Sequence, residues 1–298
     1  MSDTGPAAPI TLGEVTISRV VEIGRSSFPT GSMLPESTPE AIAKHHHWLR
    51  PHFFDEAIGD LGSRIQTFVV RTPKRTVIID TGVGNDKPRD GSPAWHLRQG
   101  SYLADLAAAG VTPEDVDLVL CTHLHIDHVG WNTRLVAGRW RPTFPNARYV
   151  FAGEEFEFWK HESRKPGGNE PCIGDSVLPV ADAGQALLVA GNHVVDEYLR
   201  FEPSPGHTPG HVFVRLRTSA GEAVFSGDVM HRTVQVAEPQ WNSRFCQDPV
   251  RARAAREDFV AHHADSGVLV LAAHFPKPGF IVRRDGGYRF EALELAAA

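Results

Sequence analysis

The chain has 298 residues, of which 41% are hydrophobic and 22% charged, and its formal net charge is −6. This composition is typical of a folded globular protein and excludes a fibrous or largely disordered chain, and the acidic balance without a run of Lys and Arg argues against nucleic acid as a partner. The N-terminal residues show no basic and apolar leader, and no stretch approaches the roughly 20 apolar residues of a membrane span, so we expect a cytoplasmic protein without a membrane partner.

The first part of the chain contains a long insertion between two predicted strands. Strands rich in β-branched residues are predicted over 14–23, 65–71 and 75–80. Residues 26–60 are rich in Pro, Ser and His, and we expect an N-terminal arm or lid there, because a long insertion with few strand signals is usually functional. Thr38 followed by Pro39 predicts the start of a short helix. The consecutive residues His45 to His47 would point in different directions on that helix, which favours packing or solvation over a metal site.

The remainder of the chain alternates helices and strands. Helices are predicted over 102–109, 154–161 and 249–263. Strands are predicted over 116–122, 148–152, 198–203, 211–216, 223–226, 268–273 and 280–284. A Gly and Pro loop is expected between residues 161 and 198. Two β-rich halves with helices between their strands favour a single α/β domain over residues 1–298, in which a sheet sandwich is covered by helices.

Histidine is the unusual residue type, because 16 are present and the neutral imidazole is the commonest metal ligand in proteins. The cysteines are odd in number and form no Cys-x-x-Cys pair, so Cys121, Cys172 and Cys246 are expected to be structural thiols rather than a disulfide framework.

Four potential ligands lie within six residues, directly after the buried strand that ends near Thr122: His123, His125, Asp127 and His128. Buried polar groups without partners cost several kcal/mol, so an ordinary core strand does not explain them. Alternation lets His123 and His125 face one side of an extended segment, while Asp127 and His128 lie where the chain turns. One loop of this kind can serve two ions.

Three more polar residues follow apolar strands, which is where open sheets place their sites. They are His207 in the segment Gly206–His211, Asp228 after the run that ends at Ser226, and His274 after the last long apolar run. Asp80, at the end of another strand, is a candidate to support the ligands.

With these residues in this order, the chain resembles the metallo-β-lactamase superfamily from Asp80 to His274. The resemblance implies an αββα sandwich, two mixed β-sheets flanked by helices. It also implies two bound ions, with His123, His125 and His207 on one, Asp127, His128 and His274 on the other, and Asp228 as the bridge. Divalent ions are expected, Zn²⁺ above all, with Fe, Mn and Co as alternatives. A hydroxide between the ions would be the nucleophile, and His211 would form structural hydrogen bonds.

Within the superfamily, residues 227–231 and 241–245 resemble the lactonase and methyl parathion hydrolase branch. A β-lactamase is disfavoured because the best-known subclass has Cys at the position of Asp228, and a flavodiiron protein because that group has Glu at the position of His125. Members that process RNA carry basic substrate arms, whereas this chain is acidic. Lactonases that act on acyl-homoserine lactones have Tyr at the position of His231, which leaves the choice of lactone open.

We therefore expect a dinuclear metal-dependent hydrolase that cleaves a carboxylic ester or lactone, with phosphotriesters as related substrates. Asp127, Asp228 and His231 are the expected catalytic residues, and His231 either contacts the substrate or packs. An iron-dependent sulfur or redox enzyme and a glyoxalase II-like thioester hydrolase of the same fold are the alternatives.

The expected partner is a small-molecule ester or lactone, and the N-terminal arm is a candidate surface for a homodimer. The aromatic residues near the arm and after Asp228 either line an apolar pocket or belong to the core. They are Trp48, Phe53, Phe54, Trp241 and Phe245.

Overall fold

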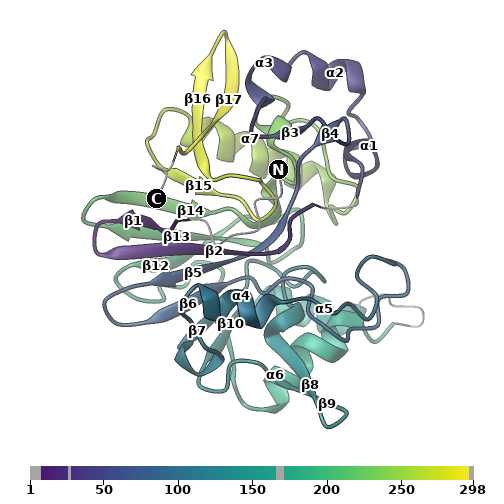
Figure 1. Cartoon of the computed structure of the whole chain (residues 1–298), viewed down its shortest axis with the longest axis vertical. Coiled ribbons are helices and arrows are strands. Elements are labelled where there is room, and N and C mark those ends of the chain that lie inside the picture. Colours follow the sequence, from purple (N-terminus) through teal and green to yellow (C-terminus); the bar gives the residue numbers. More distant parts are fainter. Residues whose placement is uncertain (1–7, 26–27, 166–170, 295–298) are drawn as a thin grey trace. The chain divides into compact units, whose positions relative to one another are not determined.

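The computed structural model describes residues 8–25, 28–165 and 171–294, and the chain divides into two compact units (Figure 1). Unit 1 comprises the chain up to Gly24 together with Ile65–His193, and unit 2 comprises Arg25–Arg64 together with the chain from Val194 onward. Each unit is built on one large mixed sheet, as predicted. The expected single domain over residues 1–298 is not decided by this division and stays a prediction.

The sheet of unit 1 has seven strands. In spatial order they are β1 (Ile10–Leu12), β2 (Val15–Ile23), β5 (Ile65–Arg71), β6 (Thr76–Ile79), β7 (Leu118–Leu120), β10 (Arg148–Ala152) and β11 (Ala186–Val189). Neighbours from β1 to β6 are antiparallel, and neighbours from β6 to β11 are parallel. Because β6 and β7 are parallel, the residues that follow them emerge at the same edge of the sheet.

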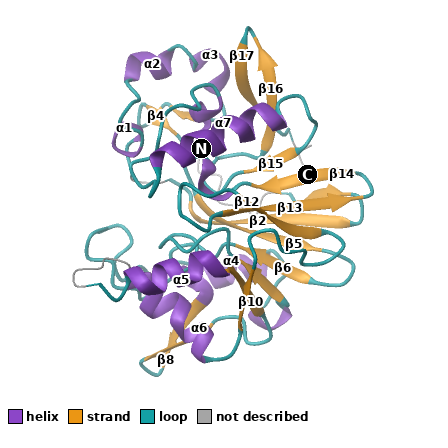
Figure 2. Ribbon diagram, turned by 180° about the vertical axis from the view of Figure 1, so that it is seen from behind, coloured by secondary structure: helices purple, strands orange, loops and turns teal. Residues whose placement is uncertain are grey.

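Helices cover one face of this sheet (Figure 2). They are α4 (Tyr102–Ala108), α5 (Gly153–Glu162) and α6 (Leu178–Asp182), the last preceded by a π-helical turn, η3 (Ile173–Val177). Buried side chains from the helices, such as Leu106 and Phe156, share one core with Val119 and Phe151 of the sheet. The unit also contains the turns η1 (Pro113–Asp115) and η2 (Gly130–Asn132) and the hairpin β8 (Thr133–Val136) and β9 (Arg139–Pro142).

The prediction of a loop between residues 161 and 198 is wrong, because this stretch contains η3, α6 and β11. Pro179 lies in the first turn of α6, where proline costs no hydrogen bond and starts a helix rather than ending one.

Unit 2 is built on a six-stranded sheet. Its strands in spatial order are β12 (Leu199–Pro203), β13 (Val212–Thr218), β14 (Gly221–Phe225), β15 (Leu269–Leu271), β16 (Gly279–Arg284) and β17 (Gly287–Ala292). Only β14 and β15 pair in parallel. The long helix α7 (Pro249–His263) has the predicted bounds, because the Asp248 carboxylate caps it by accepting from the Arg251 amide and Pro249 occupies its first turn. The turns η4 (Gly227–Val229) and η5 (Thr233–Val236) follow β14.

The N-terminal arm, residues 26–60, lies in unit 2 apart from its first two residues, which fall outside the described ranges. It forms α1 (Thr30–Met33), α2 (Pro39–Ala43), α3 (His46–Leu49) and a small hairpin of β3 (Phe54–Asp55) and β4 (Asp60–Leu61). The Thr38 hydroxyl caps α2, as predicted. Leu34, Leu49 and Phe53 are buried in the same core as Phe259 of α7.

The aromatic candidates separate into two groups. Phe53 is 1% exposed and Trp241 7%, and both belong to the core of unit 2, while Trp48 and Phe54 pack against that core. Phe245 is 39% exposed and forms an edge-to-face contact with Phe28. Among the five, Phe245 is therefore the candidate that remains for a pocket wall.

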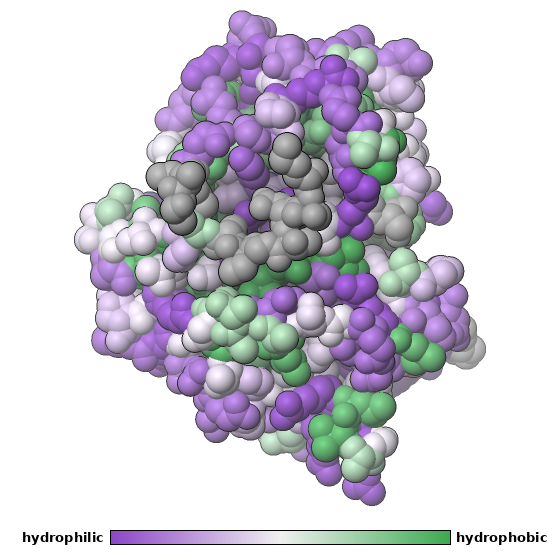
Figure 3. All heavy atoms as spheres, in the orientation of Figure 1, coloured by the Kyte–Doolittle hydropathy of each residue, from purple (hydrophilic) through white to green (hydrophobic). Residues whose placement is uncertain are grey.

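The surface in Figure 3 mixes polar and apolar residues, with an apolar patch at its lower end, where Figure 1 places the tip of the β8–β9 hairpin. The exposed Leu135 and Val136 belong to that hairpin. Within the described part of the chain, no helix has the length and apolar character that crossing a bilayer requires.

Candidate metal centre

In unit 1, Asp80 follows β6 and connects it to the histidine loop after β7. Its carboxylate accepts hydrogen bonds from the Thr122 amide and hydroxyl, each at 2.8 Å, and from Nδ1 of His128 at 2.9 Å. The residue adopts a left-handed backbone conformation, with φ of 55°, which turns the chain away from the strand. Asp80 thus holds both ends of the segment between Thr122 and His128, as its position at the strand end predicted.

The side chains of the histidine loop cluster as the alternation predicted. The ring centroids of His123 and His125 are 4.7 Å apart, those of His123 and His128 are 4.1 Å apart, and Asp127 Oδ1 lies 3.8 Å from His128 Nε2. The Trp159 ring of α5 packs edge-on against His125, with centroids 5.2 Å apart. The loop therefore places four potential ligands side by side within unit 1.

The hydrogen bonds at Nδ1 determine which ring nitrogen carries the proton. The carboxylate of Asp80 accepts from His128 Nδ1, and the Thr122 hydroxyl, which donates to Asp80, accepts from His123 Nδ1 at 3.1 Å. In the neutral rings, Nε2 then keeps its lone pair. This is the tautomer of a histidine that binds a metal through Nε2.

A buried glutamate that the sequence analysis missed supports this loop. Glu22 of β2 accepts from the amides of Val83 and Gly84 and from the indole of Trp131, at 2.6 to 3.1 Å. Burial raises the pKa of the Glu22 carboxyl, and this effect is larger than that of the hydrogen bonds, which lower the pKa. Glu22 joins the turn after Asp80 to the turn after His128. A glutamate among the β-branched residues of the strand predicted over 14–23 was the signal in the sequence.

In unit 2, three imidazoles surround the carboxylate of Asp228, which lies in η4 directly after β14. The distances to Nε2 are 3.3 Å for His207, 3.1 Å for His231 and 3.0 Å for His274. His207 belongs to the loop after β12, and His274 follows β15. All four side chains are buried. The structure therefore brings together the three predicted ligands of this unit and the predicted catalytic residue His231.

His274 and His211 have opposite hydrogen-bond roles. Nδ1 of His274 donates to the Arg64 carbonyl at 2.8 Å, which leaves Nε2 as its acceptor nitrogen. Nε2 of His211 accepts from the Asp228 amide at 3.0 Å, so this nitrogen is engaged by the backbone and not oriented to bind an ion. The geometry matches the expected structural role of His211.

The electrostatics around Asp228 leave a place for positive charge. Burial lowers the pKa of His207, but hydrogen bonds and charges of Asp228 and Cys246 outweigh it and raise the pKa to about 9. Burial lowers the pKa of His231 to about 3, although Asp228 opposes the shift. His231 is therefore neutral at pH 7 and donates from Nε2 to Asp228, whereas His207 is the position at which a cation balances the carboxylate.

Two further groups hold the segment after Asp228, and neither was predicted. Gln235 Oε1 accepts from the amides of His231 and Arg232, and the buried Arg256 of α7 donates to the Val229 carbonyl at 3.2 Å. Each acts on the backbone, so no spacing in the sequence marks it.

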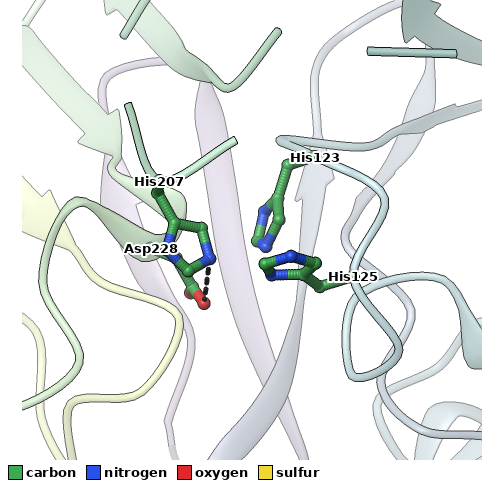
Figure 4. Close-up of side chains that lie close together, drawn as sticks. All are labelled: His123, His125, His207 and Asp228. Atoms are coloured by element: carbon green, nitrogen blue, oxygen red, sulfur yellow. Dashed lines mark ion pairs between the residues drawn. The ribbon is translucent and has the colours of Figure 1, made fainter. Parts of the chain in front are cut away.

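The donor set fits a transition-metal site. Buried imidazoles and carboxylates are the ligands that zinc and similar divalent ions take in catalytic centres. Figure 4 draws His123 and His125 of unit 1 with His207 and Asp228 of unit 2, and marks the ion pair of His207 with Asp228.

Buried histidines and aspartates at the strand ends of two mixed sheets define the class of a metal-binding α/β protein. The chain belongs to the metallo-β-lactamase superfamily, which matches residues 62–289. This confirms the predicted family and fold class.

Among its relatives, the N-acyl homoserine lactonase AttM of Azorhizobium caulinodans is 29% identical over 171 residues, which are 51% of this chain and 60% of the relative. The acyl-coenzyme A thioesterase MBLAC2 of Bos taurus is 25% identical over 189 residues, 62% of this chain and 63% of the relative. The chain thus spans about 60% of the length of these curated relatives.

Two solved structures share the fold along the whole chain. The hydrolase AbOPH of the β-lactamase superfamily has a TM-score of 0.80 and 26% identity, covering 99% of this chain and 100% of its own. AidC, a dizinc quorum-quenching lactonase solved with its product, has a TM-score of 0.73 and 19% identity over 98% of this chain and 99% of its own. The second likeness shows the fold alone. Lactonase, thioesterase and hydrolase relatives agree with the predicted hydrolase class.

Proposed function

We propose that the ligands of the two units form one dinuclear centre. His123, His125, His207 and Asp228 would hold one divalent ion, and Asp127, His128 and His274 the second, with Asp228 as the bridge. The match to the superfamily supports this assignment because it spans both units. Zn²⁺ is the proposed ion, since the donors are imidazole nitrogen and carboxylate oxygen without a thiolate.

The proposed reaction is hydrolysis of a neutral carboxylic ester or lactone, with phosphotriesters as additional substrates. When bound, such ions acidify a water molecule and polarise the substrate oxygen. The lactonase relatives and the AbOPH likeness support this substrate class. The thioesterase relatives keep a thioester as the second candidate.

The chain's own residues would orient the reacting groups and supply one neutral donor. His231 is held by Gln235 at its amide and carries a proton on Nε2, 3.1 Å from Asp228 Oδ2. A neutral imidazole there can donate to an oxygen on which negative charge develops, as a Tyr hydroxyl does in related lactonases. Asp127 and Asp228 would keep the centre near neutrality, because each carboxylate offsets one unit of cation charge.

The observation that carries the proposal is the convergence of three imidazoles on the buried Asp228 carboxylate within 3.3 Å. Its test is metal analysis of Asp228→Ala beside the wild type, with lactones, aryl esters, thioesters and phosphotriesters as substrates. We expect about two zinc ions per wild-type chain, loss of metal in the variant and loss of hydrolysis. Full metal content and turnover in Asp228→Ala would remove this residue from the centre. About one iron per wild-type chain, with oxidation of a thiol, would favour the redox alternative.

The role of His231 has a separate test. His231→Phe should keep both ions and lower turnover on lactones about ten- to a thousandfold, the range for losing one donor to a developing oxyanion. His231→Tyr should recover part of it. If lactone turnover in His231→Phe equals that of the wild type with both ions bound, the residue only packs.

The proposal extends to the organisation of the protein. One domain over residues 1–298 should unfold in a single transition that different probes report identically. Cysteines that remain thiols and form no disulfide, as Cys121, Cys172 and Cys246 do, suit a reducing compartment, which supports a cytoplasmic location. A homodimer through the arm should show as twice the chain mass in sedimentation equilibrium.

A further inference from the structure

His207 lies between two partners in unit 2. Its Nε2 faces Asp228 Oδ2 at 3.3 Å, and its Nδ1 faces the Cys246 sulfur at 3.7 Å. The ring is buried, and the thiol is partly buried. A sulfur at this distance is within hydrogen-bonding range, because sulfur is larger than oxygen. The thiol therefore contacts the side of the ring opposite Asp228.

The backbone fixes the thiol in this place. The Gln247 amide donates to the His207 carbonyl at 2.9 Å, and the Asp248 amide donates to the Gly206 carbonyl at 3.0 Å. The segment that carries Cys246 thus runs along the segment that carries His207. Asp248 also caps α7, so the end of this segment is anchored to a long helix.

Three other proposed ligand histidines share this arrangement, in which Nδ1 has a hydrogen-bonding partner. His123 is paired with the Thr122 hydroxyl, His128 with the Asp80 carboxylate and His274 with the Arg64 carbonyl. In each case an acceptor at Nδ1 orients the ring so that Nε2 is the nitrogen available to an ion. Cys246 takes this place at His207.

We propose that Cys246 is a positioning residue for the metal centre: its sulfur accepts a hydrogen bond from Nδ1 of His207 and holds the ring with Nε2 toward Asp228. The inference rests on the proposed function, because it assigns His207 as a ligand. A thiol is a weaker acceptor than a carboxylate or a carbonyl. Among His123, His128, His207 and His274, the ring of His207 therefore has the weakest hydrogen-bond acceptor at Nδ1. We expect the ion that His207 binds to dissociate first.

The N-terminal arm contributes to this support. Met33 at the end of α1 accepts from the Arg244 amide at 3.0 Å, and its sulfur lies 3.4 Å from the Ser243 hydroxyl. The Cys246 amide in turn donates to the Ser243 carbonyl. Met33 of the arm thus holds the segment that carries Cys246, which gives it an indirect role in metal binding without its providing a ligand.

The test compares Cys246→Ala and Cys246→Ser with the wild type, by zinc competition against a chelator and by the visible spectrum of the cobalt(II)-loaded proteins. Loss of an outer partner of a ligand histidine typically weakens metal binding about 10- to 100-fold, and we expect this for one of the two ions in Cys246→Ala. The intensity of the visible cobalt(II) bands should fall by the part that the cobalt ion at this site contributes. Cys246→Ser retains an acceptor and should recover most of the affinity.

Cys121→Ala is the matched control, because Cys121 is a buried thiol in unit 1 whose sulfur contacts the side-chain amide of Asn132. It should lower the melting temperature and leave zinc affinity within about twofold of the wild type, the margin that separates it from the 10-fold loss above. Equal affinity in Cys246→Ala and wild type, with two zinc ions bound, overturns this inference alone. Wild-type protein that binds no zinc overturns the proposed function and this inference together.

Discussion

Lys87 is a buried cation in unit 1 whose effect on stability depends on pH. Its Nζ is fully buried, donates to the Thr133 hydroxyl at 2.5 Å and to the Asp175 carbonyl at 3.0 Å, and lies 3.6 Å from the centroid of the Trp140 ring. Arg89 forms a bidentate pair with the same Asp175, at 2.6 and 3.0 Å. Because Lys87 Nζ also lies 3.6 Å from Asp175 Oδ1, the two buried cations share one carboxylate.

Burial lowers the pKa of Lys87 to about 7, against the attraction of Asp175, which raises it. In the unfolded chain a lysine titrates near about 10.4. Below pH 7 both states carry the proton. Between pH 7 and about 10 the unfolded chain binds one proton more than the native one, so the free energy of unfolding rises with pH, by at most about 1.4 kcal/mol per pH unit.

Lys87→Met removes this titration and keeps the volume and the bidentate pair of Arg89 with Asp175. We expect the free energy of unfolding of the variant not to rise with pH through this group. The difference in free energy of unfolding, wild type minus variant, should therefore increase by about 1 kcal/mol for each pH unit above 7. Urea unfolding at pH 6.5, 7.5, 8.5 and 9.5 measures the difference. Parallel curves for the two proteins across this range would show that Lys87 does not titrate there and would refute the argument.

Three further predictions concern other described contacts. His211→Ala should lower the free energy of unfolding by about 1–3 kcal/mol, because the buried Asp228 amide loses its acceptor, while metal analysis should still find two ions; loss of one ion with an unchanged melting temperature would make His211 a ligand. Gly130→Ala should prevent folding, because a Cβ there would lie 1.9 Å from the Val83 carbonyl carbon and oxygen, and a circular dichroism melt like that of the wild type would contradict this. Phe53→Ala should cost about 3–5 kcal/mol in a urea titration, because the ring is buried against Phe290; a cost below about 1 kcal/mol would mean that the arm is a mobile lid rather than part of the core.

Much of the fold could be predicted because local and tertiary signals agree. The strands over 65–71 and 148–152 and the helix over 249–263 have the predicted bounds. The strand predicted to be the last is followed by β17, which was missed because its burial pattern is mostly exposed or intermediate and its sequence carries Arg289 and Glu291. Pairing with β16 makes it a strand, and pairing is not visible in a local pattern.

The candidate ligands were predictable for another reason. A histidine or aspartate directly after a buried strand is costly unless it has a role, so His123, His207 and Asp228 stand out in the sequence alone. Their supports do not. Glu22 and Cys246 are far from the ligands in sequence or ordinary in context, and only folding brings them to the turn after Asp80 and to the ring of His207.

The division of unit 2 into two chain segments has a consequence for synthesis on the ribosome. The arm leaves the ribosome early, but its core partners in α7 and the six-stranded sheet follow only after residues 65–193 have been made. At about 5–20 residues per second, synthesis from the end of the arm to the end of α7 takes roughly 10 to 40 seconds. During that time Leu34, Leu49 and Phe53, which the finished protein buries, have no native core to enter. The nascent chain therefore exposes these three apolar side chains until the C-terminal third arrives.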